Sequence, residues 1–292
     1  MKLITPVEIT DSILVSSNVP ETDHPAWVSG TTYTVDQRVI YQHNIYQRLI
    51  AGAGTTPPSI DTVNWVFVSA TNRWKMFDKK GGSQTDYTSP ITVTLSVPNV
   101  INSVALLLLS ASTVRVKMIA NAATVYDTTV TLTSYVSNMW EYFFIPPVKQ
   151  ETVVFTDLPQ YANSTLEITI TNSSGNAKVG SCIVGLLQQF GNTQYGASVG
   201  IQSYSIKQRD SFGNINIISR AYNDKARFNV RLLSSETDRL KQVLTSLRDT
   251  PVLYIGSELF TSTTVYGFYK DFDIVLTSFP YSDCSIEVEG LV

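Results

Sequence analysis

The chain has 292 residues and a formal net charge of −3, and charged residues make up 15% of it, against about 25% in an average globular domain. This length exceeds what one hydrophobic core comfortably holds, so we expect two or three domains. The small negative charge excludes a chain-wide basic field of the kind that attracts nucleic acid. Thr, Ser, Asn and Gln replace the missing charges, which favours an extracellular or virion β-protein, or surfaces buried in an assembly.

Targeting and membrane segments are not predicted. Pro6, Glu8 and Asp11 interrupt any apolar stretch near the start, so the first residues do not read as a signal peptide. The longest apolar run, Val104 to Leu109, has six residues, far short of the roughly 20 that span a bilayer. We expect synthesis in the cytosol, no membrane insertion, and release, if any, by another route such as cell lysis.

Residues 1–25 are expected to form an N-terminal arm. They contain Pro6, Pro20 and Pro25 and only short β-prone pieces such as residues 13–15. Such a segment is expected either to contact a neighbouring subunit or domain, or to be partly disordered.

Residues 26–69 carry aromatic side chains at short intervals, separated by turn residues, which predicts a small β module. A module of this size buries little area, so large rings must supply its core. The pattern consists of Trp27, Gly30, Tyr33, Val39, Tyr41, Tyr46 and Trp65. It resembles the chitin-binding type 5/12 carbohydrate-binding modules of bacterial chitinases and cellulases.

This resemblance implies aromatic faces that stack on sugar rings, with Tyr41, Tyr46 and Trp65 as the candidates for carbohydrate binding. The family often carries a tryptophan just after the last tyrosine, whereas this chain has Gln-Arg-Leu-Ile at 47–50. The core aromatics are kept while the usual sugar platform is missing. A docking or spacer module, whose aromatics are core, is the alternative that this departure favours.

The stretch 70–78 joins the small module to the rest of the chain. Trp74 and Phe77 stand there among charged residues, with neither a clean strand alternation nor a helix stripe. We interpret the stretch as an anchor, with Trp27 and Tyr33 as the structural aromatics on the module side and Trp74 and Phe77 on the other. An ordinary first strand of a sandwich is the alternative, because strands are rich in aromatics.

Residues 70–190 are expected to form a β-sandwich of jelly-roll type. Alternating or continuous apolar segments recur between turn signals, as at 91–97, 104–109 and 165–171, and give seven or eight short strands. The resemblance to galactose-binding-like jelly rolls is one of architecture and implies no function.

Residues 191–292 are expected to form an α+β domain, in which one helix packs on an antiparallel sheet. The helix is predicted at about 235–249. Ser234 or Ser235 is expected to cap it, with Asp238 completing a capping box. One apolar stripe is formed by Leu240, Val243, Leu244 and Leu247.

The cysteines and histidines indicate neither a metal site nor a cofactor. Cys182 and Cys284 lie in apolar, β-like surroundings and are interpreted as two buried free thiols, with one disulfide as the alternative. His24 and His43 have no cysteine or second histidine at metal-ligand spacing.

Catalytic signatures are absent from the sequence, which has no nucleophile elbow, zinc-protease motif, P-loop or dinucleotide-binding glycine motif. The pairs Glu287/Glu289 and Asp271/Asp273 each share a strand face, which indicates a solvated face or ion pairs more often than a glycosidase acid–base pair. Lysines and arginines are spread out, so specific nucleic-acid binding is not predicted. We therefore predict that the chain is not an enzyme.

Two parts of the chain together resemble structural proteins of tailed bacteriophages. One is the run 72–78 after the aromatic cassette. The other is a C-terminal pattern of a Phe-x-Val strand, a capped helix, Thr250-Pro251, a Tyr-Gly-Phe strand and the ending 286–291.

This resemblance implies a non-enzymatic component of a virion tail, collar or baseplate, made in the host cytoplasm and present in several copies. Its partners would be copies of itself and other virion tail proteins, docked through β surfaces low in charge. The alternative is a carbohydrate-binding adhesion or receptor-binding protein that uses the 26–69 module on a host surface glycan. A glycan hydrolase with an appended binding module is a third, less favoured hypothesis, because no acid–base pair is defined.

Overall fold

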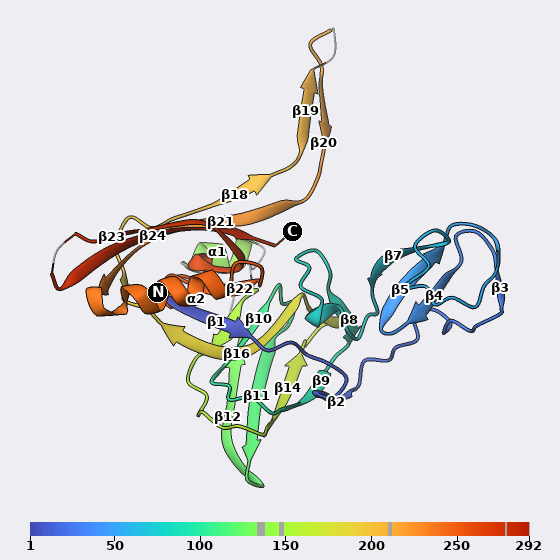
Figure 1. The fold of residues 1–292 in the computed structure, drawn as a ribbon, viewed down its shortest axis with the longest axis horizontal. Helices are drawn as coiled ribbons and strands as arrows, with labels where there is room; N and C mark the ends of the chain where they lie inside the picture. Colours follow the sequence, from blue (N-terminus) through green and yellow to red (C-terminus); the bar gives the residue numbers. More distant parts are fainter. Residues whose placement is uncertain (133–137, 146–148, 210–211, 278, 292) are drawn as a thin grey trace.

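The computed structural model describes residues 1–132, 138–145, 149–209, 212–277 and 279–291. The chain is mainly β, with a sandwich, a curled antiparallel sheet and one packed helix, and this confirms the predicted fold class (Figure 1). The small module stands at one side of a larger body, and a thin hairpin projects from the top of the body.

The small module contains two small antiparallel sheets. β4, β5 and β7 form one, and β3 pairs with β6 in the other. The turn between β4 and β5 places Gln42 and His43 at positive φ, the conformation that a two-residue hairpin turn requires. The strands are β3 (Thr32–Tyr33), β4 (Arg38–Tyr41), β5 (Asn44–Arg48), β6 (Gly52–Ala53) and β7 (Trp65–Ala70).

A five-stranded antiparallel sheet forms one layer of the sandwich. Apolar and polar residues alternate along its strands, so every second side chain enters the core. Its order is β12 (Ala123–Thr131), β11 (Thr113–Ala120), β14 (Ser164–Thr171), β9 (Ile91–Val97) and β2 (Leu14–Ser17).

The second sheet is larger and runs through the whole body, with β18 (Ser198–Ser203) also paired to β21. All of its strand pairs are antiparallel. Its order is β13 (Val153–Phe155), β10 (Ser103–Leu107), β16 (Ser181–Gln189), β1 (Lys2–Pro6), β22 (Val252–Ile255), β23 (Thr264–Val275), β24 (Tyr281–Gly290), β21 (Tyr222–Leu233) and β17 (Asn192–Thr193).

Strand β1 belongs to the segment expected as an N-terminal arm, yet it lies inside this sheet. Ile4 pairs with Leu187 of β16 on one side and with Leu253 of β22 on the other, and it is fully buried. The start of the chain therefore completes the body of its own molecule. One continuous sheet spans residues 70–190 and 191–292, which the sequence pattern predicts to be separate domains.

Two large hydrophobic cores lie in the body. The first fills the sandwich and draws on the five-stranded sheet together with β10, β13 and β16. The second lies between the C-terminal half of the large sheet and α2 (Thr237–Ser246). Because side chains alternate across a strand, Leu3 of β1 enters the second core while Ile4 joins a smaller cluster on the other face.

Helix α2 carries the predicted apolar stripe, with Leu240, Leu244 and Leu247 buried. The predicted capping box is wrong, because residues 234–236 form a 3₁₀ turn (η2, Ser234–Glu236) that leads directly into the helix. Glu236 takes the N-cap position without a side-chain bond. The hydroxyl of Ser234 instead contacts that of Ser282 at 3.0 Å.

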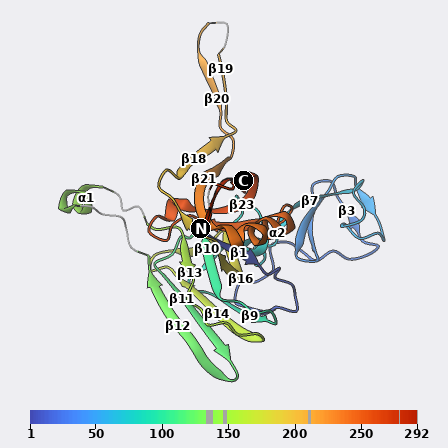
Figure 2. The ribbon, with the colours of Figure 1, turned by 60° about the vertical axis from the view of Figure 1, so that its left-hand side comes forward.

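The remaining elements are short, and two of them protrude. Figure 2 shows α1 (Met139–Phe144) standing away from the body, and β19 and β20 form the projecting hairpin of Figure 1. Among the described residues, no helix is long and apolar enough to cross a membrane. The other elements are β8 (Thr85–Thr88), β15 (Asn176–Val179), β19 (Ile206–Arg209), β20 (Ile215–Ile218), η1 (Lys75–Phe77) and η3 (Thr261–Thr263).

Candidate functional site

Trp65, a predicted sugar-stacking residue, lies in the core of the small module and is 3% exposed. The edge of Tyr33 meets its ring at 5.2 Å between centroids, and the guanidinium of Arg48 lies over the ring at 4.9 Å. Both contacts are favourable for an aromatic ring. The Trp65 ring therefore has no open face for a sugar in this conformation.

The two candidate tyrosines also pack inward. Tyr46 is buried beside Phe67, with centroids 6.0 Å apart, and burial raises the pKa of its phenol. Tyr41 is half-buried against the edge of Trp27 at 5.4 Å. The three candidates for sugar binding thus lie together in one aromatic cluster. They do not form an exposed row of rings on which a sugar could stack.

Arg48 follows Gln47 in the stretch after Tyr46, and it is itself 3% exposed. Its guanidinium donates to the carbonyl of Gly52 at 3.3 Å and lies 3.9 Å from the carboxylate of Asp61. Asp61 also accepts from Asn64 and fixes the turn before β7. A buried arginine with a carboxylate partner therefore stabilises this part of the module.

The joint is organised around Glu21. This carboxylate accepts from Nδ1 of His43 at 2.9 Å and from the hydroxyl of Thr71 at 2.8 Å, and it lies 3.8 Å from Arg73. The other ring nitrogen of His43, Nε2, lies 2.8 Å from the carboxylate of Asp11. The N-terminal segment, the β4–β5 turn and the start of the joint are therefore held in one polar network.

Aromatic packing continues this joint into the sandwich. The ring of Trp74 lies against His43 at 4.5 Å and meets the edge of Phe77 at 6.0 Å. Met76 is buried in the sandwich core, and its amide donates to the hydroxyl of Thr85 at 3.0 Å. Residues 75–77 form a 3₁₀ turn, so the stretch is not the first strand of the sandwich but is bound on both of its sides.

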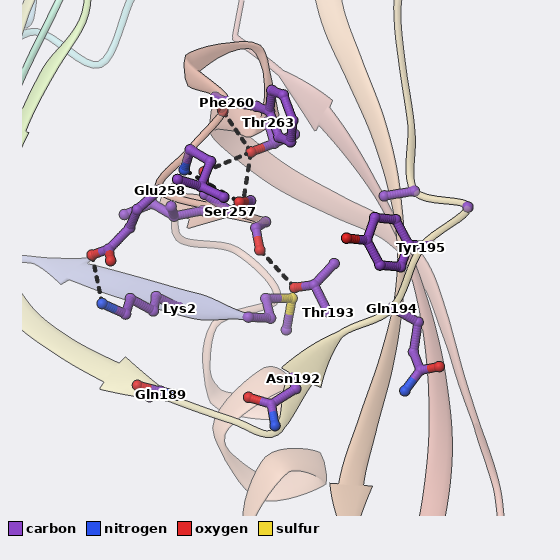
Figure 3. Close-up of a pocket in the computed structure, with 16 residues that line it drawn as sticks. Lys2, Gln189, Asn192, Thr193, Gln194, Tyr195, Ser257, Glu258, Phe260 and Thr263 are labelled. Atoms are coloured by element: carbon purple, nitrogen blue, oxygen red, sulfur yellow. Dashed lines mark hydrogen bonds and ion pairs between the residues drawn. The ribbon is translucent and has the colours of Figure 1, made fainter.

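A pocket of about 460 Å³ opens beside β1 and β22 (Figure 3). Its charged groups are paired with each other, because Lys2 contacts Glu258, and this contact lowers the pKa of that carboxyl. The hydroxyl of Thr193 donates to the Gly256 carbonyl at 2.6 Å, and Thr263 closes the loop opposite it. The Lys2–Glu258 pair and the hydroxyls of Thr193 and Thr263 are therefore engaged within the fold.

The acidic pairs considered above lie on the outer face of the C-terminal sheet. Glu287 lies 3.7 Å from Lys270, and Glu289 accepts from Asn223 at 2.7 Å and from Tyr204 at 3.0 Å. Within the described ranges, no group of three or more His, Cys, Asp or Glu side chains is placed to hold a metal ion.

Both cysteines are free and buried, in two different cores, as the interpretation of free thiols predicts. Burial raises the pKa of Cys182 to about 12. Burial, with a contribution from the charge of Asp273, raises the pKa of Cys284 to about 11. Both thiols are therefore protonated and unreactive at neutral pH.

Two groups of exposed apolar side chains were not found by sequence reasoning. They lie on α1 and on the β19–β20 hairpin, outside the aromatic module of residues 26–69. The dense aromatic run 139–144 was the available signal for α1. The hairpin offered only a glycine turn between two short isoleucine-containing segments.

No known family model matches the chain, and no curated protein or solved structure matches it either.

Proposed function

We propose that the chain is a non-enzymatic structural component of a tailed-phage virion, in the tail, collar or baseplate. It assembles there with copies of itself and with other tail proteins. The assembly part of this proposal is carried by helix α1. The virion part is supported by the resemblance of residues 72–78 and of the C-terminal pattern to structural proteins of tailed phages.

Five of the six residues of helix α1 are apolar or aromatic, and all five are exposed; the sixth is Glu141. Asn138 caps it by accepting from the amide of Glu141 at 2.9 Å, and the rings of Trp140 and Phe144 contact each other at 5.5 Å. The exposed fractions are 74% for Met139, 63% for Trp140, 68% for Tyr142, 67% for Phe143 and 70% for Phe144.

A helix in which five of six side chains are apolar is normally enclosed by protein or lipid on those sides. A six-residue helix is also too short to be stable alone in water. Large exposed apolar patches on soluble proteins mark interaction sites. We therefore propose that α1 is a docking helix that becomes buried against a neighbouring subunit. This docking element is aromatic, whereas the sequence favoured broad β surfaces low in charge.

The assembly is tested by sedimentation velocity of the full chain over a range of concentrations. We expect oligomers in the wild type and their loss in the double substitution Trp140→Ser, Phe144→Ser. Leu259→Ser, at a residue that is 87% exposed, is the matched control and is expected to leave the oligomers unchanged. A wild-type chain that stays monomeric and binds no virion component contradicts the proposal.

The virion location is tested by antibody labelling of purified particles of the phage that encodes the chain. We expect label on the tail structure in electron micrographs. Particles without the protein, or specific retention of the purified chain on chitin or host polysaccharide, would favour the adhesion hypothesis instead.

A further inference from the structure

The β19–β20 hairpin projects beyond the rim of the large sheet and, among the described strands, pairs with no other (Figure 1). In its register, Lys207 opposes Ile217 and Arg209 opposes Ile215. Directly opposed residues of an antiparallel pair share a face, so these four side chains form one face of the hairpin, which we call the basic face. All four are exposed.

The basic face has no ion-pair partner among the described residues of its own chain. Among the described residues, no carboxylate lies at ion-pair distance from Lys207 or Arg209. An isolated two-stranded hairpin is at best marginally stable in water. A projecting hairpin that carries cations beside isoleucines is therefore expected to lie on another surface, one that offers both carboxylates and apolar side chains.

Such a surface exists on the outer face of the C-terminal sheet, where charges are sorted by strand. β21 presents a basic row and β24 an acidic row, and they are joined by the ion pair of Arg231 and Asp283 at 3.0 Å. β23 presents Asp271 and Asp273, both exposed and, within the described chain, without a basic partner. The basic row is Lys225, Arg227 and Arg231, and the acidic row on β24 is Asp283, Glu287 and Glu289.

The β23 edge of this face combines charge with apolar area. Val275 and Leu276 follow the two aspartates and are 50% and 74% exposed. We call these four residues the acidic edge. Asp271 directly opposes Glu287 in the register. Glu287 already has Lys270 at 3.7 Å, whereas Asp271 has no basic partner among the described residues.

The hairpin does not fold back onto the acidic edge of its own chain. Tyr204, at the hairpin's base, donates to Glu289 at 3.0 Å and accepts from Asn223 at 3.1 Å, which fixes the direction of departure. Arg209 lies five residues further along an extended chain, roughly 16 Å away at the rise of a strand. The views in Figures 1 and 2 show the hairpin leading away from the body.

We propose that the basic face of one copy binds the acidic edge of a second copy of this chain. In this contact Lys207 and Arg209 face the two aspartates of the acidic edge, and the two isoleucines pack on its two apolar side chains. The two surfaces are therefore complementary in charge, and both contribute apolar area. The inference rests on the proposed function in requiring that several copies assemble. It goes further by naming both surfaces of one contact.

Charge reversal on full-length protein, read by sedimentation velocity, tests the contact. One variant carries Lys207→Glu with Arg209→Glu, and the other carries Asp271→Lys with Asp273→Lys. Each is expected to weaken self-association at least about tenfold, since close interfacial charge pairs couple by 1.5 kcal/mol or more. Arg38→Glu with Lys241→Glu, at two exposed sites elsewhere, is the matched control and should have no effect.

Mixing the two variants in equal amounts gives the decisive measurement. In the mixture, each reversed hairpin meets an edge of opposite charge on the other variant, so association is expected to return to the wild-type level. Raising the salt concentration should weaken the wild-type contact, because exposed charges are screened. Circular dichroism of each variant establishes that it is folded before the comparison.

Failure of the mixture to associate, when each variant is folded, overturns the inference. So does an effect of the hairpin variant alone, which would point to an acidic partner other than this chain, such as nucleic acid. Oligomers that persist in both variants refute this contact but leave the proposed function standing. A strictly monomeric wild type refutes both.

Discussion

The small module and the body place their aromatic side chains in opposite ways. The module has a short chain with little to bury, and it encloses Tyr33, Tyr46 and Trp65 almost completely. The body has two large cores, and it leaves Trp140 and Phe144 in solvent. Shortage of core therefore does not explain the exposed rings. Rings in the module stabilise the fold, and rings on the body's projections are available to partners.

Trp65→Ala should give the largest effect on stability, because it empties the centre of the module. Truncating a buried tryptophan costs about 3–5 kcal/mol, and Arg48 would also lose the ring that it covers. Chemical denaturation followed by tryptophan fluorescence measures the loss. Phe67→Ala, on the same strand and 43% exposed, is the control, and an equal loss in that variant would contradict the distinction between core and surface rings.

Trp74→Ala tests whether the joint holds the module against the body. The ring is half-buried, so we expect a smaller loss of about 1–3 kcal/mol, together with loosening of the contact with His43. Limited trypsin digestion measures the loosening. Wild type should be cut at exposed sites such as the Lys79–Lys80 turn, and the variant should gain cleavage at Arg73. Rapid cleavage at Arg73 in the wild type would show that the joint is a flexible linker.

Alkaline pH should destabilise the body through its two thiols. Their pKa values in the folded state, about 12 and about 11, lie above the ordinary 9.0. The unfolded chain loses these protons first, so stability is full below pH 9 and falls as pH rises above it, by about 1 kcal/mol per thiol per pH unit.

Urea denaturation at pH 8 and pH 10 measures this slope. Cys182→Ala with Cys284→Ala should be less stable at pH 8, because it leaves cavities, but should lose less stability between the two pH values. A slope equal to that of the wild type would place the titrating groups elsewhere, for example among the buried tyrosines. Maleimide should label neither thiol in the folded protein.

Removing the rings of α1 should have the smallest effect on stability. Trp140→Ser with Phe144→Ser deletes side chains that no described core encloses, and exposed substitutions usually change stability by less than about 0.5 kcal/mol. Thermal unfolding of the variant, measured at a concentration where the wild type is monomeric, checks this. A large loss would mean that α1 packs against its own body.

The β class, the aromatic core of the module and the apolar stripe of α2 follow from local pattern. Residues two apart share a strand face and residues three to four apart share a helix face, so periodicity predicts which side chains turn inward. The same reasoning identifies the module's rings without any contact being known. Free cysteines follow similarly from their apolar surroundings.

Position in the sheet was decided only by the tertiary structure. The segment Lys2–Pro6 has a strand pattern, but its partners Gln189 and Ile255 lie far along the chain, and no local signal specifies such pairing. Long-range contacts also decided three further features. They are the loss of the expected serine cap of α2, the burial of Trp65 under Arg48 and the pairing of Asp271 with Glu287. Local sequence determines which face of an element is apolar, whereas long-range pairing determines whether that face meets the chain's own core or is left for a partner.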